Sequence, residues 1–143
     1  MYSFLEQTVE DYMTRDVKTV MGSLTVRELG DLFEKDDFNA YPVEESARVV
    51  GVVSKFDHLS CFVFSATQMV PRYDDLMKRT VSEMMTSEFI YVAMDTKLTR
   101  VLQLMVDHRI RSMPVIDKDQ RLAGIISRED VMRALQRCTG GKS

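Results

Sequence analysis

Cysteine, positive charge and long apolar runs are all scarce in this chain of 143 residues. No second Cys lies near Cys61 or Cys138, which favours two reduced, packed thiols over a metal site. The formal net charge of −3 provides no broad positive field for nucleic acid. The longest uncharged run, residues 59–71, is too short and too polar to cross a bilayer. These absences argue against a metalloprotein, a nucleic-acid-binding protein and a membrane protein.

The composition that remains is that of a globular domain, with 45% hydrophobic and 29% charged residues. A chain of this length buries one sizeable core. Residues 1–7 lack the basic region and apolar run of a signal peptide. We therefore expect the protein to work in the cytoplasm.

Three short motifs occur twice, in the same order and at nearly constant spacing. They are Val-x-x-x-Met-Thr at 9–14 and 81–86, Pro-Val at 42–43 and 114–115, and Gly-x-x-Ser-x-x-Asp at 51–57 and 124–130. One extra residue in the second copy shifts the spacing between the last two motifs. Chance explains a single match but not an ordered set, so the chain consists of two copies of one unit.

Each copy predicts the element order β-α-β-β-α. In the first copy, Thr25-x-x-Glu28 is a capping-box signature, and apolar residues recur after it at helical spacing. Two strands rich in β-branched residues follow, and a second helix begins near Ser54 and near Ser127. The strands at 49–53 and 122–126 are apolar at consecutive positions, which predicts burial on both faces.

The repeat also predicts the domain organisation of an α+β fold. One copy of about 55 residues is marginal alone, so we expect the two to pack sheet to sheet around a shared core. The predicted segments are a first repeat with an N-terminal helical segment at 1–61, a connector at 62–80 with a helix around 73–77, a second repeat at 81–138, and a frayed tail at 139–143.

The Ser-x-x-Asp ends of the repeats have two interpretations. A Ser followed by an acid three residues later begins a helix, and such a cap contributes about 1 kcal/mol. Ser54 with Asp57 and Ser127 with Asp130 also follow apolar strands, and an Asp there can accept hydrogen bonds from two neighbouring sugar hydroxyls. Capping and ligand binding can coexist at one position.

The repeated Met-Thr opening, the Pro-Val strand and the Gly-x-x-Ser-x-x-Asp ending resemble a tandem pair of CBS domains, known as a Bateman module. The resemblance covers about residues 9–138. It implies two β-α-β-β-α units with pseudo-twofold symmetry and two clefts between them. Nucleotide-binding members hold the ribose through the Asp of this motif, with the Ser close to ribose or phosphate.

Carried over to this chain, the resemblance implies a set of ligand-binding residues. Asp57 and Asp130 become ribose ligands, Ser54 and Ser127 lie beside ribose or phosphate, and the residues that would line the adenine are Thr19, Val20, Tyr91 and Val92.

The stretch at 108–115 resembles the phosphate-facing segment of the gamma subunit of AMP-activated kinase. Arg111 is the first candidate for phosphate and Arg109 the second, because a guanidinium matches phosphate geometry. The first copy has Asp36 and Asp37 at the matching place and no basic residue, so we expect the two clefts to bind charged nucleotides unequally.

The sequence offers no catalytic residues, no activated nucleophile and no metal ligands, and we predict no enzyme activity. The first hypothesis is a regulatory, energy-sensing module that binds AMP, ADP or ATP, with S-adenosylmethionine or NAD as alternative ligands. The resemblance implies a homodimer that acts on an unidentified protein target, without nucleic acid or membrane. The second hypothesis is a ligand-independent dimerisation or scaffold module, in which Ser and Asp only cap helices.

Overall fold

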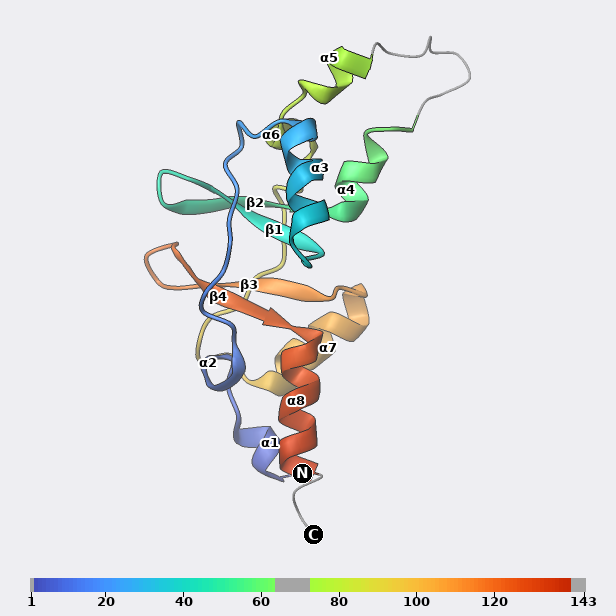
Figure 1. The fold of residues 1–143 in the computed structure, drawn as a ribbon. Coiled ribbons are helices and arrows are strands. Elements are labelled where there is room, and N and C mark those ends of the chain that lie inside the picture. The colour runs from blue at the N-terminus through green and yellow to red at the C-terminus, as the bar shows by residue number, and fades with distance from the viewer. Residues whose placement is uncertain (1, 64–72, 140–143) are drawn as a thin grey trace. The chain divides into compact units, whose positions relative to one another are not determined.

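The computed structural model describes residues 2–63 and 73–139 (Figure 1). Residues 64–72 of the predicted connector and 140–143 of the predicted tail lie outside this part. The elements are α1 (Tyr2–Glu6), α2 (Val9–Tyr12), α3 (Val26–Lys35), β1 (Ala40–Glu45), β2 (Arg48–Ser54), α4 (Lys55–Ser60), α5 (Tyr73–Met77), α6 (Val81–Met84), α7 (Leu98–His108), β3 (Ser112–Ile116), β4 (Leu122–Ser127) and α8 (Arg128–Thr139).

The chain forms two compact units, one of residues 18–89 and one of residues 1–17 together with 90–143. The repeat divides the sequence at 61 and 81, whereas the compact units divide it at 17 and 89. The reason is that the segment opening each repeat pairs with the sheet of the other repeat. Thr14 pairs with Ile125, and Thr86 pairs with Val52.

The unit of residues 18–89 is built on the antiparallel hairpin of β1 and β2. Val20 pairs in parallel with Val43 on one edge, and Thr86 pairs with Val52 on the other. Helix α3 packs against α4 and α5, and α6 packs against β2. The buried residues at the centre are Val20, Leu29, Tyr41, Val43, Val53 and Val81.

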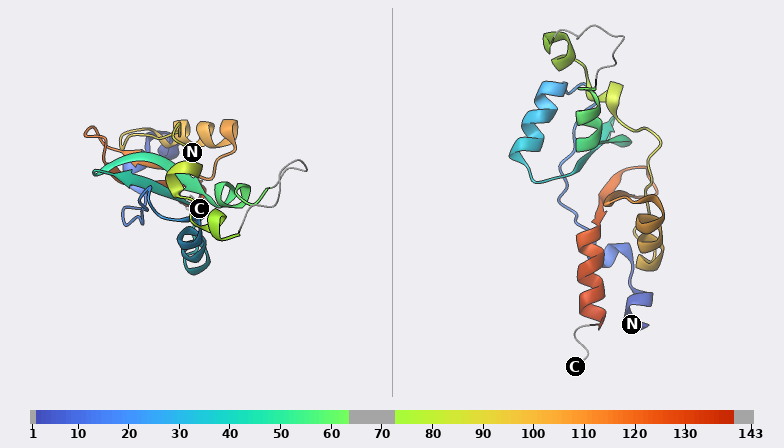
Figure 2. Two further views of the ribbon diagram at one scale, coloured as in Figure 1. Left: turned by 90° about the horizontal axis from the view of Figure 1, so that it is seen from above. Right: turned by 90° about the vertical axis from the view of Figure 1, so that its right-hand side faces the viewer.

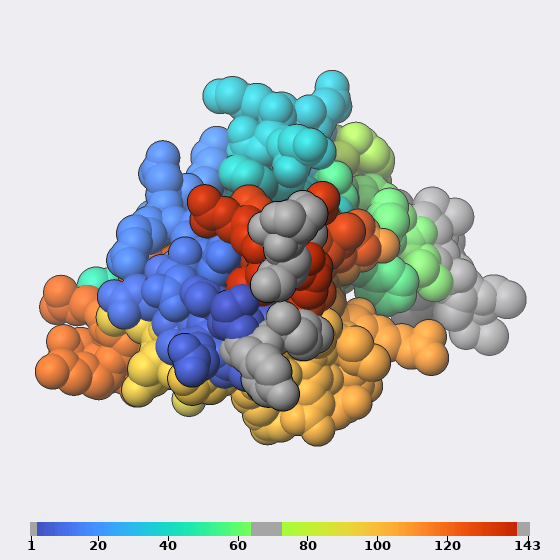
Figure 3. Space-filling view, turned by 90° about the horizontal axis from the view of Figure 1, so that it is seen from below, coloured from blue at the N-terminus to red at the C-terminus, as the bar shows by residue number. Residues whose placement is uncertain are grey.

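The unit of residues 1–17 and 90–143 repeats this plan with β3 and β4. Val92 pairs in parallel with Val115, which corresponds to the edge pair of the other unit. Helix α1 packs against both α7 and α8, and the right-hand view of Figure 2 shows the three side by side. Figure 3 shows the blue N-terminal residues beside the red residues of α8. The N-terminal segment therefore completes this core, with Phe4 and Val9 buried.

The glycine of each Gly-x-x-Ser-x-x-Asp motif lies where the opening segment of the other repeat crosses the sheet. A Cβ atom on Gly124 would lie 2.5 Å from the carbonyl oxygen of Thr14. A Cβ on Gly51 would lie 2.6 Å from Sδ of Met85 and 3.0 Å from the carbonyl oxygen of Thr86. Glycine is needed at Gly124 because the crossing backbone approaches too closely for any side chain, whereas at Gly51 the closest atom belongs to the flexible Met85 side chain.

The structure confirms the α+β class and the element order in each repeat, although the first strand is reduced to a single bridge at Val20 and at Val92. The Thr25 capping box is present, with Glu28 N donating to Thr25 Oγ1 at 3.2 Å and Thr25 N donating to Glu28 Oε1 at 3.0 Å. Helix α5 coincides with the helix predicted around 73–77.

The expectation that strands 49–53 and 122–126 are buried on both faces is only half correct. In β2 and β4 alternate residues are fully buried, and the residues between them are only partly covered within the part of the chain that is described. The alternation is that of a sheet with one well-packed face.

Candidate functional site

Ser54 and Asp57 form a reciprocal cap at the start of α4, in the unit of residues 18–89. Ser54 N donates to Asp57 Oδ2 at 2.9 Å, and Asp57 N donates to Ser54 Oγ at 3.0 Å. The Asp57 side chain is half-buried, and no described residue donates a hydrogen bond to its Oδ1. The cap therefore uses one carboxylate oxygen and leaves the other without a partner among the described residues.

Ser127 and Asp130 form the matching cap at the start of α8. Ser127 donates to Asp130 Oδ2 from its backbone N at 2.9 Å and from its hydroxyl at 3.0 Å, and Asp130 N donates back to the hydroxyl at 3.3 Å. Asp130 is only 3% exposed. Its second oxygen, Oδ1, accepts a hydrogen bond from Arg133 Nη2 at 2.9 Å. Both oxygens of this carboxylate are therefore occupied.

Arg133 is a residue of this site that the sequence analysis missed. Its Nη2 also donates to the carbonyl oxygen of Tyr12 at 3.2 Å, and its guanidinium lies 5.9 Å from the centre of the Tyr12 ring. The spacing of Asp130 and Arg133, three residues apart on one helix, is a signal that could have indicated the ion pair. Nothing local in the sequence indicates the contact with Tyr12.

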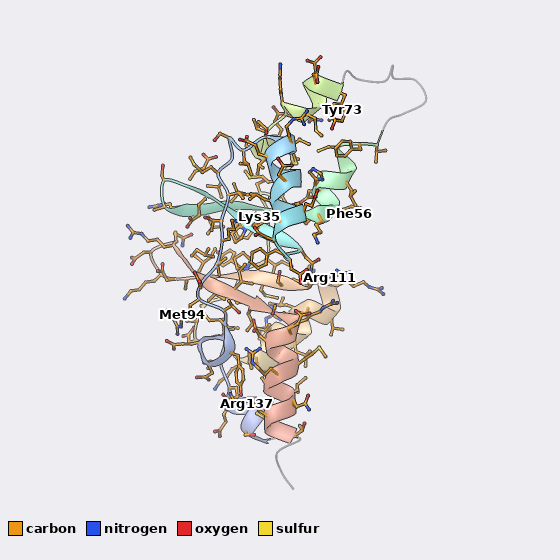
Figure 4. All side chains as sticks on the ribbon, viewed as in Figure 1. Lys35, Phe56, Tyr73, Met94, Arg111 and Arg137 are labelled. Carbon is orange, nitrogen blue, oxygen red and sulfur yellow. The ribbon has the colours of Figure 1, made fainter. Side chains whose placement is uncertain are left out.

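Arg111 lies at the same end of its sheet as Ser127. Ser112 is the register partner of Ser127, and the Arg111 carbonyl oxygen accepts a hydrogen bond from Arg128 N at 2.9 Å. The Arg111 side chain is exposed at the end of β3 (Figure 4). The structure therefore brings Arg111 to the Ser127 turn within one unit, as a phosphate contact would require.

Arg109 ends α7 in the left-handed conformation, with φ 55° and ψ 42°, and its side chain is exposed. Neither Arg109 nor Arg111 forms an ion pair with any residue in 2–63 or 73–139. Both guanidinium groups are therefore available to an anion.

The acidic stretch of the first repeat is partly neutralised by its own unit. Asp36 accepts a hydrogen bond from Lys18 Nζ at 2.9 Å and another from the Tyr41 hydroxyl at 2.9 Å. The hydrogen bond from Lys18, followed by that from Tyr41, lowers the pKa of Asp36. Burial, followed by the hydrogen bond to Asp36, raises the pKa of Tyr41. Asp37 is exposed and makes no ion pair with a described residue.

The residues expected beside the adenine lie on the parallel edges of the two sheets. Val20 N donates to the Pro42 carbonyl at 3.0 Å, and the equivalent bond from Val92 N to the Pro114 carbonyl measures 3.1 Å. Val20 and Val92 are buried. Of the four expected adenine contacts, Thr19 and Tyr91 are the two with accessible side chains. The Thr19 hydroxyl donates to Glu44 Oε1 at 3.1 Å, and Tyr91 is 52% exposed.

Two further kinds of site were tested against the described residues. No group of three or more His, Cys, Asp or Glu residues in 2–63 and 73–139 could hold a metal ion. None of the helices in these ranges combines the length and apolar character needed to span a membrane.

Comparison with known proteins gives matches to both repeats. The family model of the CBS domain matches residues 9–57 and 81–137. The uncharacterized protein MJ1225 of Methanocaldococcus jannaschii is 25% identical over 131 residues, which cover 89% of this chain and 46% of that protein. The chain spans about half the length of the curated relatives it matches, at 46%, 63% and 43% for three of them.

Solved structures match over most of the chain. One is CBSX2 in complex with AMP, a protein of Arabidopsis thaliana, with 27% identity, a TM-score of 0.78, and 92% of this chain and 97% of that one covered. Another is the cytosolic domain of the Mg²⁺ channel MgtE in complex with ATP, with 25% identity and a TM-score of 0.71. That match covers 90% of this chain and 48% of the channel domain.

Proposed function

Because this chain belongs to the CBS domain family, we propose that it is a regulatory module that binds an adenosine nucleotide at its Ser-x-x-Asp turns. AMP, ADP and ATP are the proposed ligands. The observation that carries the proposal is the Ser127 turn, where a ribose-type carboxylate and the exposed side chain of Arg111 lie at the same end of one sheet.

The chemistry of the turns suits a nucleoside phosphate. A carboxylate accepts hydrogen bonds from two vicinal hydroxyls, which assigns the ribose to Asp57 and Asp130. The hydroxyls of Ser54 and Ser127 form hydrogen bonds with Asp57 and Asp130 in those turns. We propose that these hydroxyls face ribose or phosphate. The guanidinium of Arg111, with Arg109 second, would bind the phosphate.

The adenine is assigned to the parallel sheet edges. The Thr19–Val20 and Tyr91–Val92 segments run beside β1 and β3, and their valines are fixed by sheet hydrogen bonds. A fixed backbone at a sheet edge loses little conformational entropy when it contacts a flat base. The structures with AMP in CBSX2 and ATP in MgtE support an adenine nucleotide as the ligand class.

Thermal denaturation with AMP, ADP, ATP, S-adenosylmethionine and NAD tests this function. A ligand at 100 times its Kd adds about 2.7 kcal/mol to the free energy of unfolding and should raise Tm by roughly 5–10 °C. The control is the double variant Asp57→Asn and Asp130→Asn, which keeps an oxygen for each cap and removes both carboxylate charges. It should fold and show no nucleotide shift. An unchanged Tm for the wild-type protein with every adenosine compound at millimolar concentration contradicts the proposal.

A second candidate function is a dimerisation or scaffold module, and one surface favours it. Phe56, Leu59 and Val63 are 76%, 63% and 77% exposed on or just after α4. Exposed apolar side chains at helical spacing are typical of a protein interface. We propose that they mediate a homodimer, and Figure 4 labels Phe56 on this helix.

Sedimentation of the wild-type protein and of a Phe56→Glu, Leu59→Glu variant tests the dimer. The variant should be monomeric, with its helix content kept. A dimer that forms without any nucleotide shift would favour the scaffold over the sensor. A wild-type protein that remains monomeric at a concentration on the order of 100 μM contradicts the dimer.

We also propose that the module acts on a protein target in the cytoplasm and has no catalytic activity of its own. Both cysteines are free. Burial raises the pKa of the Cys61 thiol, which disfavours the thiolate that a nucleophile requires. Incubation with ATP should release no phosphate, and measurable hydrolysis would contradict this part of the proposal.

A further inference from the structure

The two Ser-x-x-Asp turns differ in the side chain that follows each Asp by three residues. After Asp57 this residue is Ser60, whose hydroxyl donates to the Phe56 carbonyl oxygen at 2.9 Å and does not reach Asp57. After Asp130 it is Arg133, whose Nη2 donates to Asp130 Oδ1 at 2.9 Å. The repeats share their capping geometry but not the environment of the second carboxylate oxygen.

The Arg133–Asp130 pair covers the carboxylate oxygen that the cap leaves over. Oδ2 accepts from the backbone N and the hydroxyl of Ser127, and Oδ1 accepts from Arg133. The Asp130 side chain is 5% exposed, whereas that of Arg133 is 53% exposed. A ribose hydroxyl could reach Oδ1 only by displacing the Arg133 guanidinium. Because the Arg133 side chain is half exposed, water can solvate the guanidinium once it is displaced.

Displacing Arg133 would also break its link to the N-terminal segment. The same Nη2 donates to the Tyr12 carbonyl oxygen at 3.2 Å, and the guanidinium makes a cation–π contact with the Tyr12 ring at 5.9 Å from its centre. A hydrogen bond between charged groups contributes more than a neutral one, and the cation–π contact adds to it. The competition is therefore between ribose hydroxyls and one arginine that is held at three points.

We propose that Arg133 is a specificity-determining residue that closes Asp130 to ribose, so that the second turn binds a nucleoside phosphate more weakly than its arginines would suggest. The inference rests on the proposed function. It leaves Asp57, with one oxygen free of described partners, as the turn that a ribose enters at lower cost. Occupation of Asp130 would release Tyr12 from Arg133.

Arg137 provides a matched control. It lies one helical turn further along α8, and its guanidinium is also 5.9 Å from the centre of the Tyr12 ring. It carries the same charge and makes the same ring contact, but it makes no ion pair with Asp130 or any other described residue. Replacing Arg137 changes the local charge and the stacking while the pair between Arg133 and Asp130 remains.

The test is calorimetric titration of AMP into the full chain with the first turn silenced by Asp57→Asn. Adding Arg133→Ala should tighten AMP binding by about three- to ten-fold. This is the range expected when AMP no longer has to displace a partly exposed guanidinium from Asp130. Adding Arg137→Ala instead should change the Kd by less than about two-fold. If Arg133→Ala does not fold by circular dichroism, Arg133→Gln is titrated in its place and should also tighten binding.

The outcomes separate the inference from the proposed function. If the wild-type protein binds AMP but the Arg133 variants bind it no more tightly than the Asp57→Asn parent, Arg133 does not close the site and the inference is overturned. A merely structural role for Arg133 predicts weaker binding together with lower stability. If the wild-type protein binds no AMP at all, the proposed function itself fails.

Discussion

Replacing Gly124 by Ala tests the crossing of the Thr14 segment over the sheet. The new Cβ would lie 2.5 Å from the Thr14 carbonyl oxygen and 3.3 Å from Met13 Sδ. A contact of 2.5 Å with backbone cannot be relieved by a rotamer change, so the Thr14 segment must move. This movement should break the two backbone hydrogen bonds that join Thr14 and Ile125, which measure 2.8 and 2.9 Å.

The size of the effect follows from these contacts. Two hydrogen bonds contribute about 1 kcal/mol each, and overpacking adds about 1–3 kcal/mol where the neighbours cannot relax. The free energy of unfolding should therefore fall by about 3–5 kcal/mol in the Gly124→Ala variant. This is a large fraction of the roughly 5–15 kcal/mol that stabilises a domain.

Two other glycines give a graded control series. At Gly51 the closest atom is Met85 Sδ, a flexible side-chain atom at 2.6 Å, with the Thr86 carbonyl at 3.0 Å, so Gly51→Ala should cost less than Gly124→Ala. At Gly30, inside α3, a Cβ meets only the ring of His58 at 3.1 Å. There the gain in helix propensity of up to about 1 kcal/mol should offset the contact, and stability should change little.

Urea denaturation gives the stabilities, and amide hydrogen exchange localises the change. In the Gly124→Ala variant the amides of Thr14 and Ile125 should lose protection first, while those of the unit of residues 18–89 keep theirs. A Gly124→Ala variant that is as stable as the wild-type protein, with both amides still protected, would refute the steric account of this glycine.

Two further predictions concern the unit of residues 18–89. Thr25→Ala removes the capping box of α3 and should lower the free energy of unfolding by about 1 kcal/mol in urea titrations, and an unchanged midpoint would show that the cap contributes nothing. The pKa of Asp36 is lowered in the folded state, so its contribution to stability is present above its ordinary pKa of 3.8 and is lost as the pH falls through the lower folded-state value. Lys18→Ala should move the pKa of Asp36, followed by NMR titration, back toward 3.8, and a pKa that stays low would assign the shift to Tyr41 instead.

The sequence was sufficient where the signal is local. The Thr25 capping box, the helix starts at Ser54 and Ser127 and the hairpin that precedes each of these two starts depend on residues a few positions apart. The internal repeat then extended each local prediction to a second copy. The ligand-binding roles of these residues remain predictions, since the capping geometry is compatible with both interpretations of the turns.

The contacts that could not be predicted join distant parts of the chain. Nothing near Thr14 indicates that it pairs with Ile125, and nothing near Tyr12 indicates Arg133. Gly51 and Gly124 were a partial signal of this pairing, because glycine in a strand often indicates the close approach of another backbone. Which backbone segment approaches depends on the tertiary fold, and the hydrophobic periodicity of the sequence does not predict it.

The exchange of opening segments sets an order for synthesis on the ribosome. Residues 18–89 are continuous in sequence, so their unit can close while the rest of the chain is still being made. Residues 1–17 leave the ribosome before that unit, yet Ile125, the partner of Thr14, is translated after the unit is complete. Residues 1–17 are thus made before the unit of residues 18–89 but packed after it, and their apolar residues Phe4 and Val9 remain uncovered until then.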